Sequence, residues 1–300
     1  MKKTAENRYP HSATLFKFCK EALEIRYEGN VKVIDQDVGS ILGYDPADCS
    51  HWKKGKKNIH ALATLKSIAE HLNLDERLLI DVASGKIGLE EAIFEYKGYG
   101  NFALSSQYME GIKKDFFKNP DKWQNTNESK SFEEIFDLNR NKVVDVAEQV
   151  LKAGNFDEAP VYIPEVYQMY PDIQLEKDES LNQSFRVEKQ GFGESLKVTI
   201  YIKADEMRPY IRFLIARQLF KFLCESKNEI ARAFFNTPSE VQEIQANIFA
   251  STLLVPGYLL RKEIEQLNNS IDIVMQLSET FWISHSLMNQ RLRDYIEFLN

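Results

Sequence analysis

Apolar side chains recur at helical spacing through the first part of the chain. The stripe from Leu15 to Ile25 ends near Gly29 and predicts a first helix, because positions three and four residues apart share one helix face. A shorter amphipathic segment from Gln36 to Leu42 predicts a second helix. Later apolar positions continue the pattern and predict the closing helices of this region. They are Leu62, Leu65, Ile68, Ala69, Leu72, Leu74, Leu78 and Leu79.

A third helix is predicted directly after the second. Asp45 is a favoured N-cap residue, and Pro46 suits the first helical position, whose amide has no partner within the helix. This helix ends before Gly55. Two short helices joined by a tight turn that contains Gly43 form a helix-turn-helix, in which the second helix enters the major groove of DNA.

The second half of the chain combines helical spacing with one region of strand alternation. Residues 143–151 and 162–170 each predict a helix. Apolar and polar residues alternate in residues 185–187 and 196–202, on either side of a Gly-Phe-Gly turn, which predicts a hairpin. Helical spacing then returns. The whole pattern predicts a mainly α-helical protein with a small β-sheet, an α+β fold.

Composition is that of a soluble chain with two packed domains. The chain has 300 residues and a net charge of -7, with 43% hydrophobic and 28% charged residues. We recognise no signal peptide and no apolar run long enough to cross a bilayer, so no membrane contact is expected. Cys19, Cys49 and Cys224 are an odd, scattered set that indicates a reducing compartment. The expected location is the cytoplasm.

Residues 86–141 carry no recognisable motif. Aromatic residues are dense there, and residues 125–131 are the best candidate for a flexible link. Packed linker helices are the favoured interpretation, and a ligand or dimer surface is the alternative. The expected organisation is therefore an amino-terminal domain at residues 1–85, this helical and aromatic linker, and a second domain at residues 142–300.

Several short motifs of the amino-terminal region resemble the Xre/Cro/C1 repressor family. They are Gln36, Val38-Gly39, Leu42-Gly43 and Trp52-Lys53-Lys54-Gly55. In that family a Gln opens the second helix, and the recognition helix ends in Trp-x-x-Gly. The match covers most of residues 12–85. The resemblance implies a five-helix DNA-binding domain that binds paired half-sites as a homodimer.

This resemblance places the DNA contacts on and after the third helix. Residues on the helix would read base edges, and the lysines at its end would neutralise phosphates. The candidates are Gln36, Ala47, Asp48, Ser50, His51, Lys53, Lys54, Lys56 and Lys57. Asp48 is unfavourable near phosphates, although it could accept a hydrogen bond from a cytosine amine. The lysines alone would also suit a solvated loop and His51 an ordinary surface position, and Trp52 is expected in the core.

The segment from Arg212 to Lys221 has the frame of a zinc-peptidase helix with its chemistry replaced. The zincin motif is His-Glu-x-x-His, in which two imidazoles one turn apart bind zinc and the Glu activates water. Arg217, Gln218 and Lys221 occupy these positions. Together with residues 243–256, this segment resembles the ImmA/IrrE metallopeptidase-like family, in which a Glu on the second helix is the third zinc ligand.

The resemblance covers about residues 143–300 and implies a zincin-like domain. Its matching positions are Arg212, Phe213, Ile215, Ala216, Leu219, Glu243, Ala246, Asn247, Phe249, Ala250, Leu253, Leu254 and Pro256. Among the family's zinc ligands only Glu243 remains. Because Arg217 and Lys221 are cations that would repel a dication, and Gln218 cannot act as a general base, we expect no metal, no cofactor and no peptidase activity.

Two interpretations of the remaining charges are open. In the first, Arg217 and Lys221 pair with Glu243, so that fixed cations take the place of the metal charge, since a buried carboxylate left alone is costly. In the second, the three side chains face solvent in an open cleft. The first interpretation predicts that removing either charge destabilises the domain.

These features predict a sequence-specific DNA-binding transcriptional regulator whose degenerate carboxy-terminal domain senses a ligand, binds a partner or dimerises. The expected partners are double-stranded DNA, a second copy of the chain, and a peptide, repressor or small-molecule effector at the degenerate cleft. Two alternatives belong to other classes: a peptidase with a non-classical site, and an antitoxin-like module that binds protein.

Overall fold

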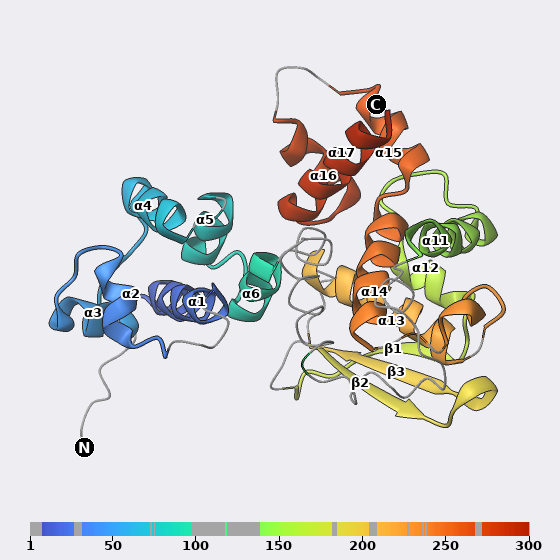
Figure 1. Ribbon diagram of the computed structural model, residues 1–300, viewed down its shortest axis with the longest axis horizontal. Helices are drawn as coiled ribbons and strands as arrows, with labels where there is room; N and C mark the ends of the chain where they lie inside the picture. Colours follow the sequence, from blue (N-terminus) through green and yellow to red (C-terminus); the bar gives the residue numbers. More distant parts are fainter. Residues whose placement is uncertain are drawn as a thin grey trace. The chain divides into compact units, whose positions relative to one another are not determined.

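The chain divides into two compact units, residues 1–98 and 99–300. The computed structural model describes residues 8–26, 32–72, 74, 76–97, 118, 139–181, 185–203, 209–226, 228–235, 237, 239–267 and 272–299. These residues are mainly helical with one three-stranded sheet, which confirms the predicted α+β class (Figure 1). Among the described helices, none is long and apolar enough to cross a membrane. The predicted flexible link at residues 125–131, with most of the linker, lies outside the described residues.

The amino-terminal unit is a helical bundle. Its described helices are α1 (Pro10–Arg26), α2 (Asp35–Ser40), α3 (Pro46–Lys53), α4 (Leu62–Leu72), α5 (Glu76–Ser84) and α6 (Leu89–Lys97). The first five lie where the hydrophobic pattern predicts them. Helix α6 packs on α1 and α5, with Ala92 fully buried and the Tyr96 ring 6.1 Å from that of Phe18. This unit therefore extends beyond the expected boundary at residue 85.

The start of α3 follows the predicted capping pattern. The Asp45 carboxylate accepts a hydrogen bond from the Asp48 amide at 2.8 Å, and Pro46 takes the first helical position. The preceding turn needs Gly43, whose φ of +64° lies in the left-handed region that a side chain disfavours. The sequence thus sets both the turn and the direction in which α3 leaves it.

Trp52 anchors α3 to the core of the unit, as predicted. Its side chain is fully buried, and its ring packs edge-on against Phe16 at 5.2 Å. The indole Nε1 donates to the Ser12 carbonyl at 2.8 Å, so the buried polar atom is satisfied. The opposite side of α3 is left to carry exposed residues.

The second unit contains the sheet and the remaining described helices. Its helices are α11 (Arg140–Gly154), α12 (Ile163–Gln168), α13 (Pro209–Glu225), α14 (Ser239–Leu254), α15 (Gly257–Ile264), α16 (Ile273–Phe281) and α17 (His285–Leu299), with short 3₁₀ turns η1 (Gly193–Ser195) and η2 (Arg232–Phe234). Its strands are β1 (Ile173–Lys177), β2 (Phe185–Gln190) and β3 (Lys197–Ile202).

Strand β3 lies at the centre of the sheet. The predicted hairpin is confirmed, since β2 and β3 pair antiparallel from Phe185–Ile202 to Gln190–Lys197. The hydrophobic pattern did not predict β1, which pairs parallel to the other side of β3. Val198, Ile200 and Ile202 of β3 are buried at alternate positions, as expected for a strand with one face on a core.

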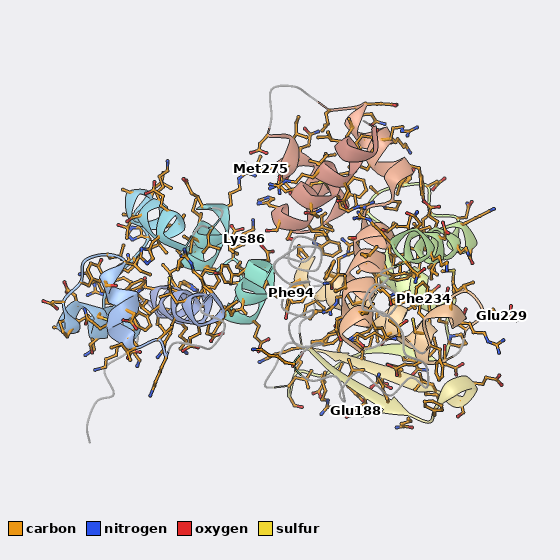
Figure 2. All side chains as sticks on the ribbon, in the orientation of Figure 1. Lys86, Phe94, Glu188, Glu229, Phe234 and Met275 are labelled. Carbon is orange, nitrogen blue, oxygen red and sulfur yellow. The ribbon has the colours of Figure 1, made fainter. Side chains whose placement is uncertain are left out.

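Helices α13 and α14 pack directly against each other, and α14 also packs on α11 (Figure 1). The Phe220 ring of α13 lies 5.2 Å from that of Phe249 on α14 and 5.5 Å from that of Phe234 in η2. Figure 2 labels Phe234 beside this helix pair. The aromatic contact fixes the turn of α13 that carries the predicted site residues.

Candidate functional site

Arg217, Lys221 and Glu243 meet between α13 and α14. Arg217 Nη2 donates to Glu243 Oε2, and Lys221 Nζ donates to Glu243 Oε1. The two cations lie one helical turn apart on α13, so they reach the same carboxylate from one helix face. The predicted pairing is confirmed, and the alternative of three charges facing solvent separately is wrong.

Burial at this site is uneven. The Arg217 and Lys221 side chains are 12% and 18% exposed, whereas that of Glu243 is 43% exposed. The cations therefore lie mainly within the unit, and their counter-charge lies at its surface. A partly buried cation needs such a partner, because removing one member of a buried pair leaves an uncompensated charge.

The side chains present do not fit a zinc ion. The cationic Arg217 and Lys221 offer no lone pair and already donate to the one carboxylate that remains. Gln218 is half-buried on the same helix, and its amide cannot take a proton from water as a Glu could. Within the described ranges, no three His, Cys, Asp or Glu side chains come together as a metal site would require.

Cys224, one turn beyond Lys221, is a core residue. It is fully buried, and burial raises the pKa of its thiol to about 12. A thiol with such a pKa is protonated at neutral pH, so it is neither a ready metal ligand nor a nucleophile. Cys224 therefore contributes to the packing of α13 rather than to chemistry.

Arg212, at the start of α13, is buried and held by three backbone carbonyls. It donates to Val161 and Phe281 at 2.7 Å each, and also to Trp282. Burial lowers the pKa of Arg212 to about 10, so its guanidinium is still charged at neutral pH. It ties α13 to the segment before α12 and to the end of α16. These three hydrogen bonds give a structural reason for an Arg at position 212, the first residue of the motif segment.

The recognition-helix candidates lie on the outer side of α3. Ala47 and His51 are exposed, and Ser50 is half-buried. Gln36 is turned elsewhere, since its Nε2 donates to the Tyr44 carbonyl at 2.8 Å and ties α2 to the turn. Ala47, Ser50 and His51 therefore lie on the same side of α3, whereas the Gln36 side chain is bound to the turn.

The four lysines fall into two pairs. Lys53 binds the Asp35 carboxylate of α2, and Lys57 binds Asp48 at 3.1 Å and lies 3.8 Å from the centre of the Tyr44 ring. Lys54 and Lys56 are exposed, and neither forms an ion pair with any residue that the structure describes. Of the four lysines predicted to contact phosphates, Lys54 and Lys56 are therefore exposed to solvent, whereas Lys53 and Lys57 have partners within the unit.

Asp35 was not among the predicted residues. It pairs with Lys53 and also with Lys20 of α1 at 3.0 Å, and these two bonds hold the pKa of its carboxyl below the usual range. The partners are 15 and 18 residues away in sequence. No local pattern connects residues at that separation, so only the packing of α1, α2 and α3 reveals the cluster.

The comparisons with known proteins bear on the second unit. Residues 172–293 match the family model of the IrrE N-terminal-like domain. This range begins before β1 and runs into α17, so it includes the sheet, α13 and α14. No curated protein and no solved structure matches the chain. The chain thus contains an IrrE N-terminal-like domain at residues 172–293, and this domain carries the Arg217, Lys221 and Glu243 cluster.

Proposed function

We propose that the protein is a sequence-specific DNA-binding regulator of transcription. The observation that carries the proposal is the arrangement of α2, the Gly43 turn and α3. Trp52 anchors α3 from inside, while Ala47 and His51 are exposed on the helix and Lys54 and Lys56 follow it. A short exposed helix with cations at its end suits a major groove flanked by phosphates.

The carboxy-terminal unit is proposed to bind rather than to hydrolyse. Two cations occupy the positions where a zinc peptidase has imidazoles, and an amide occupies the position of its general base. Such a domain would sense a ligand, bind a peptide or repressor partner, or hold two copies of the chain together. A homodimer would present two α3 helices to paired half-sites about one helical turn apart. The proposed location is the cytoplasm.

The test is selection of bound duplexes from a random pool by the full-length chain. The proposal expects one short motif, present as a pair if the protein dimerises. A Lys54→Glu, Lys56→Glu variant should lose at least about tenfold in affinity for the selected site and flatten the salt dependence by about two phosphate contacts. The matched control is Lys142→Glu, Lys152→Glu, which makes the same charge change at exposed positions of α11.

Other outcomes identify the alternatives. If the parent chain selects no sequence and the two double variants behave alike, the DNA-binding proposal fails and a protein-interaction module becomes the better interpretation. If purified protein retains a stoichiometric transition metal and cleaves peptides, the proposal of a binding domain fails in favour of a peptidase with a non-classical site.

A further inference from the structure

Asp35 occupies the junction of the first three helices, next to the proposed DNA-binding surface. Its two carboxylate oxygens bind different lysines, Oδ1 binding Lys20 of α1 and Oδ2 binding Lys53 at the end of α3. All three side chains are between 33% and 49% exposed. The pairs are therefore within reach of water and of a DNA backbone.

The charge balance of the amino-terminal unit makes the pairing of Asp35 with Lys20 and Lys53 relevant to DNA binding. Residues 1–98 contain as many Asp and Glu as Lys and Arg, so the unit has no net positive charge to attract DNA from a distance. Its attraction for phosphates depends on which individual lysines are available. The Lys54 and Lys56 side chains are exposed, whereas Lys53 already has a carboxylate partner.

A phosphate that binds Lys53 must displace Asp35 or accept it as a neighbour. Exchange is feasible because an exposed ion pair contributes little free energy. It is nevertheless costly relative to an unpaired lysine, since the displaced carboxylate stays close to a negatively charged backbone. The cost weighs most on non-specific binding, which consists of phosphate contacts made in many registers, whereas base contacts hold a specific complex in one register.

We propose that Asp35 is a specificity-determining residue, which holds Lys53 and Lys20 back from indiscriminate phosphate binding. Its effect is to weaken non-specific binding more than specific binding, so that stable association requires the base contacts of α3. This inference rests on the proposed DNA-binding function. It assigns Asp35 a role in discrimination, separate from the lysines that supply affinity.

The decisive variant is Asp35→Asn in the full-length chain, with Asp81→Asn as the control. Asp81 is also a carboxylate paired with a lysine, Lys86, at 3.6 Å, but it lies on α5, which Figure 2 places with Lys86 away from α3. The two variants change net charge equally and keep side-chain size. Affinities for the selected site and for a random duplex are measured across a salt titration, and circular dichroism checks folding.

We expect Asp35→Asn to raise affinity for the random duplex by about fivefold at low salt and to steepen its salt dependence by about one phosphate contact. Affinity for the selected site should rise less, so that the ratio of the two affinities falls. Asp81→Asn should change neither affinity by more than about twofold, since its lysine lies off the DNA surface. Adding Lys20→Gln and Lys53→Gln to Asp35→Asn should return the salt dependence to the parent value.

Two results would overturn the inference while leaving the proposed function intact. One is an Asp35→Asn variant that behaves like Asp81→Asn on both duplexes. The other is a steepened salt dependence that persists after both lysines are removed, because the effect would then not pass through them. A parent chain that binds no DNA at all would instead overturn the proposed function, and this inference with it.

Discussion

Glu243 is the carboxylate that the resemblance places as a zinc ligand, and here it binds two cations. Arg217 and Lys221 bind one oxygen each, so the carboxylate joins α13 to α14 through two charged hydrogen bonds. Hydrogen bonds to charged groups contribute more than neutral ones. The cluster is thus a structural cross-link at the place where a peptidase would hold its metal.

Replacing Glu243 by Gln should destabilise the second unit, because the mainly buried cations lose their counter-charge. We expect a loss of about 1–2 kcal/mol in the free energy of unfolding, measured by urea denaturation. Arg217→Ala should lower it by a similar amount. The control is Glu229→Gln, an exposed residue labelled in Figure 2, which should change stability by less than about 0.5 kcal/mol. Equal midpoints for Glu243→Gln and the control would contradict a cross-linking role.

At the scale of residues, the sequence predicted contacts whose positions a motif fixes. Arg217 and Lys221 share a helix face by their spacing, and the resemblance to a known motif places Glu243 opposite them. The contacts of Arg212 and of Asp35 were not predictable in the same way. Their partners are distant in sequence, and the three partners of Arg212 are backbone carbonyls, which any residue type supplies.

At the scale of elements, α3 depends on its cap. Asp45→Ala removes the acceptor of the Asp48 amide and should cost about 1 kcal/mol, whereas Asp45→Asn keeps an acceptor and should cost a few tenths. Hydrogen exchange of the Asp48 and Cys49 amides measures the fraying of the helix. We expect faster exchange than in the parent for Asp45→Ala but not for Asp45→Asn. Exchange at the parent's rate in both variants would show that the cap is dispensable.

The pair α13 and α14 offers a second test at this scale. If these helices keep the geometry of a zinc site, then Arg217→His, Gln218→Glu and Lys221→His together should create one, with Glu243 as the third ligand. We expect roughly one zinc ion per chain after dialysis, measured by elemental analysis, and none in the parent. Adding Glu243→Gln should weaken zinc binding by at least about tenfold. A triple variant that is folded but retains no zinc would mean that the geometry has been lost as well as the ligands.

The elements themselves were largely predictable. Helices α1 to α5 and the hairpin of β2 and β3 follow from hydrophobic spacing and turn residues. Strand β1 was missed because Ile173–Lys177 is only five residues long and pairs with a strand that is not its neighbour in sequence. Its edge position gives it little burial pattern, with Ile173 its one fully buried residue among the five.

At the scale of the whole molecule, each unit has its own core, and α6 shows why the boundary between them was placed too early. Leu89, Ile93 and Tyr96 pack on the amino-terminal core. From the sequence alone, a helix with one apolar face could belong either to a packed linker or to a domain. Only contacts with α1 and α5 assign it to the first unit.

Separate cores predict separate effects of core mutations. Arg212→Met removes the donor to three carbonyls and should lower the stability of the second unit by about 3 kcal/mol. Hydrogen exchange should accelerate in α13 and α16, while α1 and α5 keep their protection. Arg232→Met, at an exposed position in η2, is the control and should leave exchange unchanged. Equal acceleration in both units would contradict independent cores.

The Glu243 cross-link has a consequence for the conditions under which the second unit is assembled. A zinc peptidase acquires the counter-charge of its ligand carboxylate from solution, so its occupancy follows metal supply. Here the counter-charge is part of the polypeptide and is present as soon as the chain is made. The helix pair should therefore form equally well in a zinc-starved cell, in excess metal or in the presence of a chelator. The proposed regulator would therefore respond in the same way whether zinc is scarce or abundant.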